Sequence, residues 1–154
     1  RINITASMQP SHCASDVQLI RRYWHDQANR TYLFRSIADA GVTLAFGSDC
    51  PIEPLDPLTG IAAAIRRVPQ KSKGRFFPAE SLDAVRALRA FTVGPAVAAG
   101  EEDRRGYLLP GYPADFVILA KNPTAVSASE LYEMPVLATV LDGRIVWASS
   151  TMRL

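Results

Sequence analysis

The stretch RTYLFRSIADAGVTLAFGSDCP, residues 30–51, contains a helix pattern, a strand pattern and a polar corner in that order. Apolar side chains recur on one face of residues 30–41, and Gly41 stands where a glycine commonly ends a helix. Residues 42–46, VTLAF, form an unbroken apolar run that is typical of a parallel strand buried on both faces. The stretch therefore predicts a helix that leads into a buried strand, with Asp49 just beyond the end of that strand.

A second short buried strand is predicted upstream, at residues 2–8, INITASM. Because Pro10 cannot continue a strand ladder, residues 9–16, QPSHCASD, are expected to form a loop. One or two helical turns are expected within residues 17–24. Strand, helix and strand in this order form a βαβ unit, so the predicted fold class is α/β.

Helices are also predicted downstream, at residues 58–68 and 81–92, where apolar residues recur at helical spacing. Ser81 or Asp83 can cap the start of the second helix, because both side chains accept hydrogen bonds from free N–H groups. Residues 93–100, VGPAVAAG, are expected to add a short helical turn that ends at Gly100.

The pattern becomes β-rich after these helices. Residues 114–119 predict a strand, and residues 137–148 predict a hairpin about an Asp142–Gly143 turn. We therefore divide the chain into an α/β part, residues 1–105, and a small, mostly β part, residues 106–154.

Composition and charge argue against several classes of protein. A chain of 154 residues can bury a core, and 48% apolar with 21% charged residues is typical of a globular protein. Seventeen basic and fifteen acidic residues leave a formal charge of +2, so neither nucleic acid nor an anionic membrane is expected as the main partner. No apolar stretch approaches the roughly 20 residues of a membrane span, and no signal peptide is apparent, so the expected location is the cytoplasm.

For several other side chains the sequence predicts only whether they are paired, packed or exposed to solvent. The two cysteines, Cys13 and Cys50, make neither a disulfide framework nor a CxxC metal motif. The arginine pair at residues 66–67, like those at 21–22 and 104–105, is expected on a solvated face or loop. Val146 and Trp147 are expected to pack inside the small β part, away from any chemistry.

Polar side chains follow both predicted strands. Gln9 and His12 follow the first, and Ser48, Asp49 and Cys50 follow the second. Functional groups of parallel α/β sheets collect at the carboxyl ends of the strands, so neighbouring strands would bring these side chains to one rim. An imidazole and a carboxylate there can bind a metal, relay a proton or orient a substrate. From spacing alone, the carboxylate can equally be a turn residue that binds backbone N–H groups, and the imidazole a hydrogen-bonded loop residue.

Five segments of the chain, taken in order, resemble a known enzyme family. They are ASMQPSH, AGVTLAFGSDCPIEPLDPLTGIAAAIRR, ALRAFTVGPAVAAG, GYLLPGYPADFVILAKNP and VLDGRIVW. Together they resemble the C-terminal part of a metal-dependent amidohydrolase of family 3, the branch that includes N-substituted formamide deformylase-like enzymes. The resemblance implies the last two βα units of a TIM (β/α)8 barrel and part of a small β-sandwich.

The resemblance also implies a chemistry for the polar rim. Asp49 matches the position of a metal ligand that also accepts a proton from the attacking water. Gln9, His12 and Ser48 match positions that line the substrate pocket. The implied reaction is hydrolysis of a C–N bond in a small molecule, an amide, formamide or cyclic amide, with a divalent metal, most simply zinc, that activates the water.

The family's other metal ligands have no counterpart in this chain, which has two histidines and no HxH pair. The chain also opens without methionine, inside a predicted strand. We therefore expect a fragment that is inactive alone, holds metal weakly or not at all, and forms a homo-oligomer or joins the N-terminal part of the barrel. Two alternatives remain open: a site rebuilt by oligomerisation, and a non-catalytic assembly domain with a structural aspartate.

Overall fold

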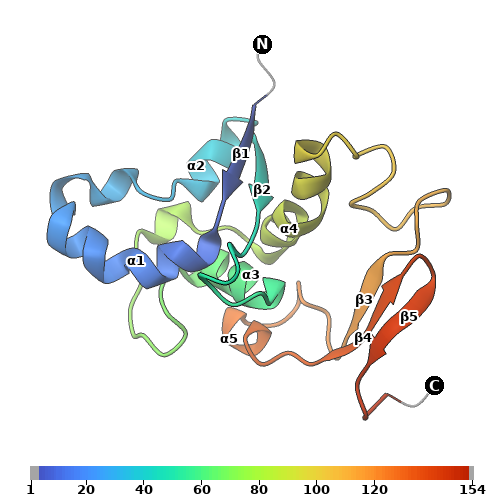
Figure 1. The fold of residues 1–154 in the computed structure, drawn as a ribbon. Helices are drawn as coiled ribbons and strands as arrows, with labels where there is room; N and C mark the ends of the chain where they lie inside the picture. Colours follow the sequence, from blue (N-terminus) through green and yellow to red (C-terminus); the bar gives the residue numbers. More distant parts are fainter. Residues whose placement is uncertain (1–3, 153–154) are drawn as a thin grey trace.

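Two short parallel strands lie at the centre of the N-terminal part. The computed structural model describes residues 4–152, in which β1 (Thr5–Met8) pairs in parallel with β2 (Thr43–Phe46). Met8 lies opposite Phe46, so both strands end at the same edge of the sheet, and Figure 1 shows their arrows pointing the same way. Residues 2 and 3 of the predicted first strand lie outside the described residues.

The connection between the two strands is helical. α1 (Pro10–Tyr23), the 3-10 helix η1 (His25–Arg30) and α2 (Phe34–Asp39) carry the chain from the end of β1 back to the start of β2. Because parallel strands need a crossover of this kind, the predicted βαβ unit is confirmed. Gly41 follows α2 with φ 80°, in the left-handed region that glycine adopts easily.

The helix α1 corrects the prediction of a loop at residues 9–16. Pro10 is the first residue of this helix, where its fixed φ suits the backbone and its missing N–H is not needed. The same proline that cannot extend a strand therefore begins a helix. His12 consequently lies on the first turn of α1 and not in a loop.

Two longer helices follow β2. α3 (Pro57–Arg66) begins at the predicted polar corner, where the Asp56 carboxylate accepts a hydrogen bond from the Leu58 N–H at 2.9 Å. α4 (Ala84–Ala98) is capped by Asp83, as predicted, and runs without a break through Pro95. The helix predicted at residues 81–92 is therefore confirmed from Ala84 onward, and the helical turn expected after it continues the same helix.

The buried residues of α4 are all small. Ala87, Ala90 and Gly94 are buried, whereas Val85, which the spacing placed on the apolar face, is 53% exposed. A Cβ added at Gly94 would lie 1.9 Å from the carbonyl oxygen of Leu44 in β2. The helix and the strand therefore meet backbone to backbone, which larger side chains would prevent.

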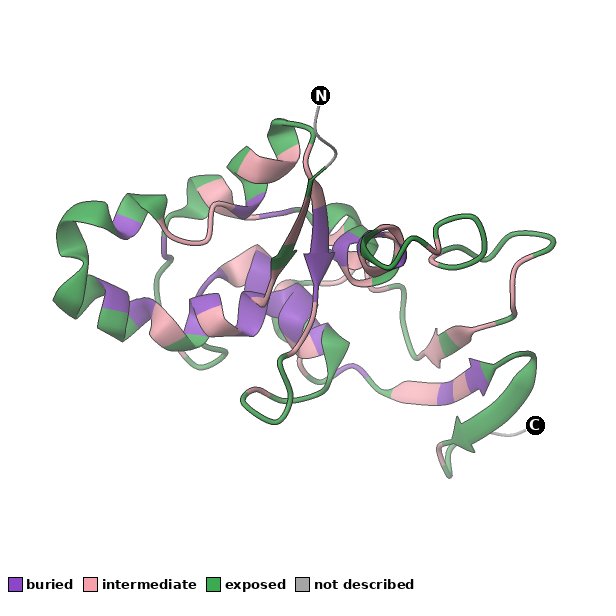
Figure 2. Cartoon of the chain, turned by 45° about the horizontal axis from the view of Figure 1, so that its top comes forward, coloured by how far each residue is buried: buried purple, intermediate pink, exposed green. Residues whose placement is uncertain are grey.

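The core lies between β2, α3 and α4. The Phe46 ring packs edge-on against Phe34 and Phe91, with ring centroids 5.2 and 5.6 Å away, a geometry that aromatic rings favour. Ala62 and Ala64 of α3 are fully buried beside them. Figure 2 shows the buried residues, in purple, concentrated on β2 and α3.

One arginine of the pair 66–67 is fully buried, against the prediction of a solvated pair. Arg67 ends α3 with φ 59°, and its guanidinium donates hydrogen bonds to backbone carbonyls of three separate segments. These acceptors are the carbonyl oxygens of Thr31, Tyr32, Phe76 and Glu80. Burial lowers the pKa of Arg67, and the guanidinium also stacks over Phe34, 5.2 Å from the ring centroid.

The C-terminal part contains an antiparallel sheet with strand order β3-β4-β5. Its strands are β3 (Phe116–Leu119), β4 (Val136–Leu141) and β5 (Arg144–Ala148). The predicted hairpin turn is confirmed, since Asp142 and Gly143 both have positive φ, 49° and 74°, as a tight hairpin requires. The boundary at residues 105–106 stays a prediction.

Two short helices complete the chain, η2 (Pro78–Glu80) and α5 (Ala128–Leu131). α5 begins with a capping box between Ser127 and Glu130, and its fully buried Leu131 joins the core. The C-terminal part is thus attached to α3 through α5. Among residues 4–152, no helix has the length and hydropathy to cross a membrane.

The outer strand β5 is exposed along its whole length. Val146 is 58% exposed and Trp147 is 50% exposed, so the prediction that they pack inside the small β part is wrong. Among the described elements only β4 contacts β5 extensively, so the faces of β5 are left open to solvent, and Figure 2 shows it green throughout.

Candidate functional site

The ends of β1 and β2 bring a histidine and an aspartate together. The Gly47 N–H donates to the Met8 carbonyl at 3.2 Å, which joins the two strand ends. Just beyond them, His12 Nε2 on α1 lies 3.5 Å from Asp49 Oδ2. The expectation that the two side chains share one rim is therefore confirmed, although His12 reaches the rim from a helix.

The His12 ring has a buried nitrogen without a hydrogen-bond partner among residues 4–152. That atom is Nε2, the one that faces Asp49. A separation of 3.5 Å is too long for a normal N–H···O bond. A buried polar atom without a partner is costly, so it marks a place where a further group can bind.

The Asp49 carboxylate is available for binding. Its side chain is 53% exposed, and within the described residues it accepts no hydrogen bond from the surrounding backbone. The turn is held instead by Ser48 Oγ, which accepts from the Cys50 N–H at 3.2 Å, and by the Asp49 carbonyl, which accepts from the Ile52 N–H at 2.9 Å. The interpretation of Asp49 as a side-chain turn former is therefore not supported.

The other two predicted site residues, Gln9 and Ser48, stabilise the local backbone beside the His12–Asp49 pair. Gln9 is the residue before α1, and its carbonyl accepts from the His12 N–H at 3.1 Å, while its side chain makes no capping hydrogen bond. Ser48 stabilises the turn that carries Asp49. Both lie beside the His12–Asp49 pair, and their contact with a substrate stays a prediction.

Two hydrogen bonds lie one turn beyond His12 on α1, and the sequence patterns suggested neither of them. Ser15 Oγ donates to Glu53 Oε1 at 2.6 Å, and Tyr32 OH donates to Asp16 Oδ2 at 2.6 Å. Burial and the Asp16 carboxylate raise the pKa of Tyr32 above its ordinary range. The sequence pattern that could have indicated these residues is helical spacing: Ser15 and Asp16 lie three and four residues after His12, on the same face of a helix.

The two cysteines differ in accessibility and reactivity. Cys13 is completely buried, and burial raises the pKa of its thiol to about 11, whereas Cys50 is exposed. Because the thiolate is the reactive form, iodoacetamide near neutral pH is expected to modify Cys50 in the folded chain and Cys13 only after unfolding in urea. Intact mass and peptide mapping measure this. Equal labelling of both residues in the folded chain would contradict the buried position of Cys13.

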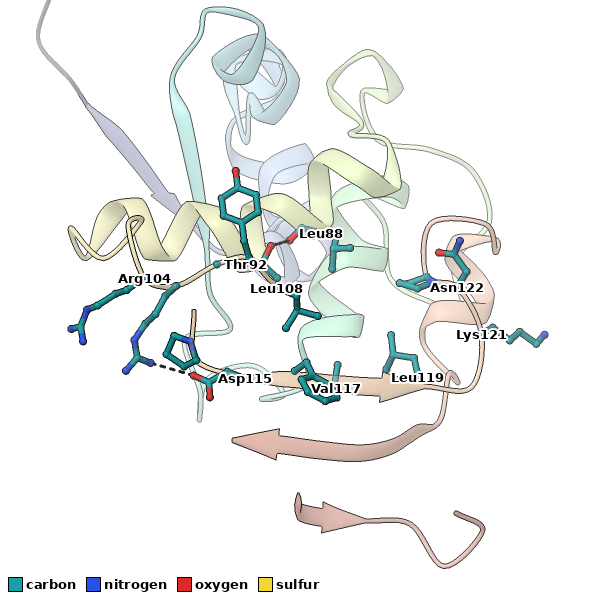
Figure 3. A pocket seen from close by; sticks show the side chains of 15 residues that line it. Leu88, Thr92, Arg104, Leu108, Asp115, Val117, Leu119, Lys121 and Asn122 are labelled. Atoms are coloured by element: carbon teal, nitrogen blue, oxygen red, sulfur yellow. Dashed lines mark hydrogen bonds and ion pairs between the residues drawn. The ribbon is translucent and has the colours of Figure 1, made fainter. Parts of the chain in front are cut away.

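A cavity of about 700 Å³ lies elsewhere. Figure 3 shows Leu88 of α4 and Leu108 above Val117 and Leu119 of β3, so the cavity is the space between α4 and the small sheet. Neither His12 nor Asp49 lines it. It is therefore not the candidate site.

The imidazole of His12 and the carboxylate of Asp49 are both of types that can bind a metal ion. Within residues 4–152, no group of three or more His, Cys, Asp or Glu side chains has the arrangement to hold a metal ion. His12 and Asp49 therefore lie together as a pair and not within such a group.

Comparison with known proteins identifies the family. Residues 1–147 match a family model described as "Amidohydrolase family". The chain belongs to amidohydrolase family 3. The resemblance carried by the five sequence segments is thereby confirmed at the level of the family.

Similar proteins are much longer than this amidohydrolase chain. The protein YtcJ of Bacillus subtilis (strain 168) is 33% identical over 153 residues, which cover 97% of this chain and 29% of YtcJ. N-substituted formamide deformylase of Arthrobacter pascens is 33% identical over 109 residues, 71% of this chain and 20% of that enzyme. An uncharacterized metal-dependent hydrolase of Pyrococcus horikoshii OT3 has a TM-score of 0.69 and 29% identity over 82% of this chain and 26% of its own. The chain spans less than a third of each.

Proposed function

We propose that this chain contributes Asp49 and His12 to a metal-dependent site that hydrolyses C–N bonds of small molecules. The observation that carries the proposal is the approach of these two side chains, 3.5 Å apart, at the carboxyl ends of two parallel strands. Membership of the amidohydrolase family supports the reaction class. The proposed substrates are amides, formamides or cyclic amides, and the similar N-substituted formamide deformylase supports the formamides among them.

The two side chains fit a metal ion as part of a ligand set. An imidazole nitrogen and a carboxylate oxygen are both zinc ligands, and catalytic zinc sites commonly use three protein ligands. The free carboxylate of Asp49 can be one of these ligands, and the unpartnered Nε2 of His12, 3.5 Å away, faces the same position. Asp49 is the proposed ligand from this chain, zinc is the proposed metal, and the remaining ligands come from other strands or another polypeptide.

The proposed task of Asp49 is proton transfer. A bound divalent metal supplies an activated water at neutral pH. The Asp49 carboxylate accepts the proton of that water and passes it to the leaving amine, as a general base and then a general acid. His12, Gln9 and Ser48 line the same rim and are proposed to orient the substrate.

The proposed architecture is the last part of a (β/α)8 barrel. In this proposal β1 and β2 are the seventh and eighth barrel strands, and β3, β4 and β5 belong to a small β-sandwich. The parallel pairing of β1 and β2 and the similarity to the Pyrococcus hydrolase support it. Association with a polypeptide that carries the other strands, or with a second copy, completes the site in this proposal.

Binding of Mn²⁺, followed by NMR, tests the site directly. The chain has two histidines, and His25 follows the far end of α1, which rises about 1.5 Å per residue from His12. Paramagnetic broadening falls steeply with distance, so Mn²⁺ at Asp49 is expected to broaden the His12 ring signals well before those of His25. Asp49→Asn is expected to remove this difference. Equal broadening of both rings in the wild type would overturn the proposed site.

A further inference from the structure

We infer that Glu53 is a positioning residue that holds the Asp49 loop against α1 through its hydrogen bond with Ser15. The inference deepens the proposed function, on which its relevance to a metal rests. The inference starts from two contacts between α1 and the loop, His12 with Asp49 and Ser15 with Glu53. His12 and Ser15 are three residues apart on α1, and Asp49 and Glu53 are four apart on the loop.

The two contacts differ in strength. The approach of His12 to Asp49, at 3.5 Å, is too long to hold the loop. The bond from Ser15 Oγ to Glu53 Oε1, at 2.6 Å, has the length of a hydroxyl donating to a carboxylate, which is a charge-assisted hydrogen bond. The second contact can therefore fix the distance at the first.

Within residues 4–152, no other hydrogen bond connects loop residues 48–55 to α1. The bonds of Cys50 and Ile52 stay inside the loop, and those of Gly47 and Asp56 join its two ends to β1 and α3. Packing does not replace them, since Ile52 and Leu55 are each 73% exposed. Glu53 is thus the main attachment of the middle of the loop.

The helix side of the contact is firmly placed. Cys13 and Val17 of α1 are buried in the core, and Asp16 accepts the hydrogen bond of Tyr32. Because α1 is anchored and the loop is not, loss of the Ser15–Glu53 bond is expected to release the loop rather than the helix. Asp49, four residues before Glu53, then loses its fixed position beside His12.

The first test measures loop order without metal. Glu53→Ala and Ser15→Ala are each expected to speed hydrogen exchange of the Ile52 amide, which is bonded to the Asp49 carbonyl, about 10-fold relative to wild type. Glu53→Gln keeps an oxygen acceptor and is expected to exchange at an intermediate rate. Leu55→Ala, in the same loop, removes no hydrogen bond and is the matched control. Wild-type exchange in both alanine variants would overturn the inference.

The second test measures the site, by Mn²⁺ broadening of the His12 ring. Each alanine variant is expected to weaken Mn²⁺ binding at Asp49 about 10-fold, a size typical of residues that orient a ligand. The double variant is expected to match the single variants, because both changes remove one bond. Selective broadening that is equal in wild type and variants would overturn the inference alone. Unselective broadening in wild type would overturn the proposed function, and amide exchange would still decide the role of Glu53.

Discussion

Asp49→Asn is expected to lower the rate of C–N bond hydrolysis about 1000-fold, the middle of the range for loss of a general base. An amide cannot accept the proton of the attacking water. The substitution also weakens the proposed metal ligand, but it is conservative for the backbone: Asp49 has φ 59°, a left-handed conformation that asparagine also tolerates. The carboxylate accepts no hydrogen bond from the described residues, so the variant loop keeps its bonds.

The measurement is kcat/KM for amine release from an N-substituted formamide, made on the assembly that holds a complete ligand set. The loss is expected in kcat, because proton transfer belongs to the transition state. Asp56→Asn is the matched control, the same change at the other end of the loop. Asparagine caps a helix about as well as aspartate, so this variant is expected to keep wild-type turnover. An Asp49→Asn variant within threefold of wild type would rule out the proposed proton transfer.

Arg67→Met is expected to lower the free energy of unfolding by about 4 kcal/mol, since each buried acceptor left without a partner costs about 1–3 kcal/mol. The guanidinium of Arg67 donates to backbone carbonyls on both sides of the core. Methionine fills similar space and supplies no donor. The left-handed backbone at this position exists in the wild type, so the variant adds no new backbone strain.

Urea denaturation measures the effect, with Arg22→Met as the control. Arg22 is exposed on α1, and its replacement is expected to change the free energy of unfolding by no more than about 0.5 kcal/mol. Arg67→Lys keeps one charged donor group and is expected to fall between wild type and Arg67→Met. If Arg67→Met does not fold, Arg67→Lys is still expected to have a lower free energy of unfolding than wild type. Equal stability of all three chains would contradict the structural role of Arg67.

The fold was predictable where local pattern and tertiary packing agree. The apolar run at residues 42–46 and the Asp142–Gly143 turn each have a single physical interpretation, and both strand and hairpin are confirmed. Pro10 was misjudged because proline has two roles: it ends regular structure in general, yet it begins α1.

The candidate site was predictable in part, for a topological reason. Groups that follow neighbouring parallel strands must share an edge, which is enough to bring His12 near Asp49. The Ser15–Glu53 bond was not predictable without α1, because only a helix places Ser15 one turn beyond His12. The burial of Arg67 was not predictable either, since its acceptors are backbone carbonyls, which every residue has and which no sequence pattern indicates.

The contact between Gly94 and the Leu44 carbonyl has a consequence for how this protein can vary. In a library that replaces every residue with all others, position 94 is expected to accept glycine alone, although it has no chemical group to contribute. Gly47, where an added Cβ meets nothing within 4 Å, is expected to accept several small residues although it lies much nearer to Asp49. Intolerance to substitution at position 94 therefore reports how closely α4 approaches β2. A ranking of positions by tolerance alone would not distinguish such a packing contact from a catalytic residue.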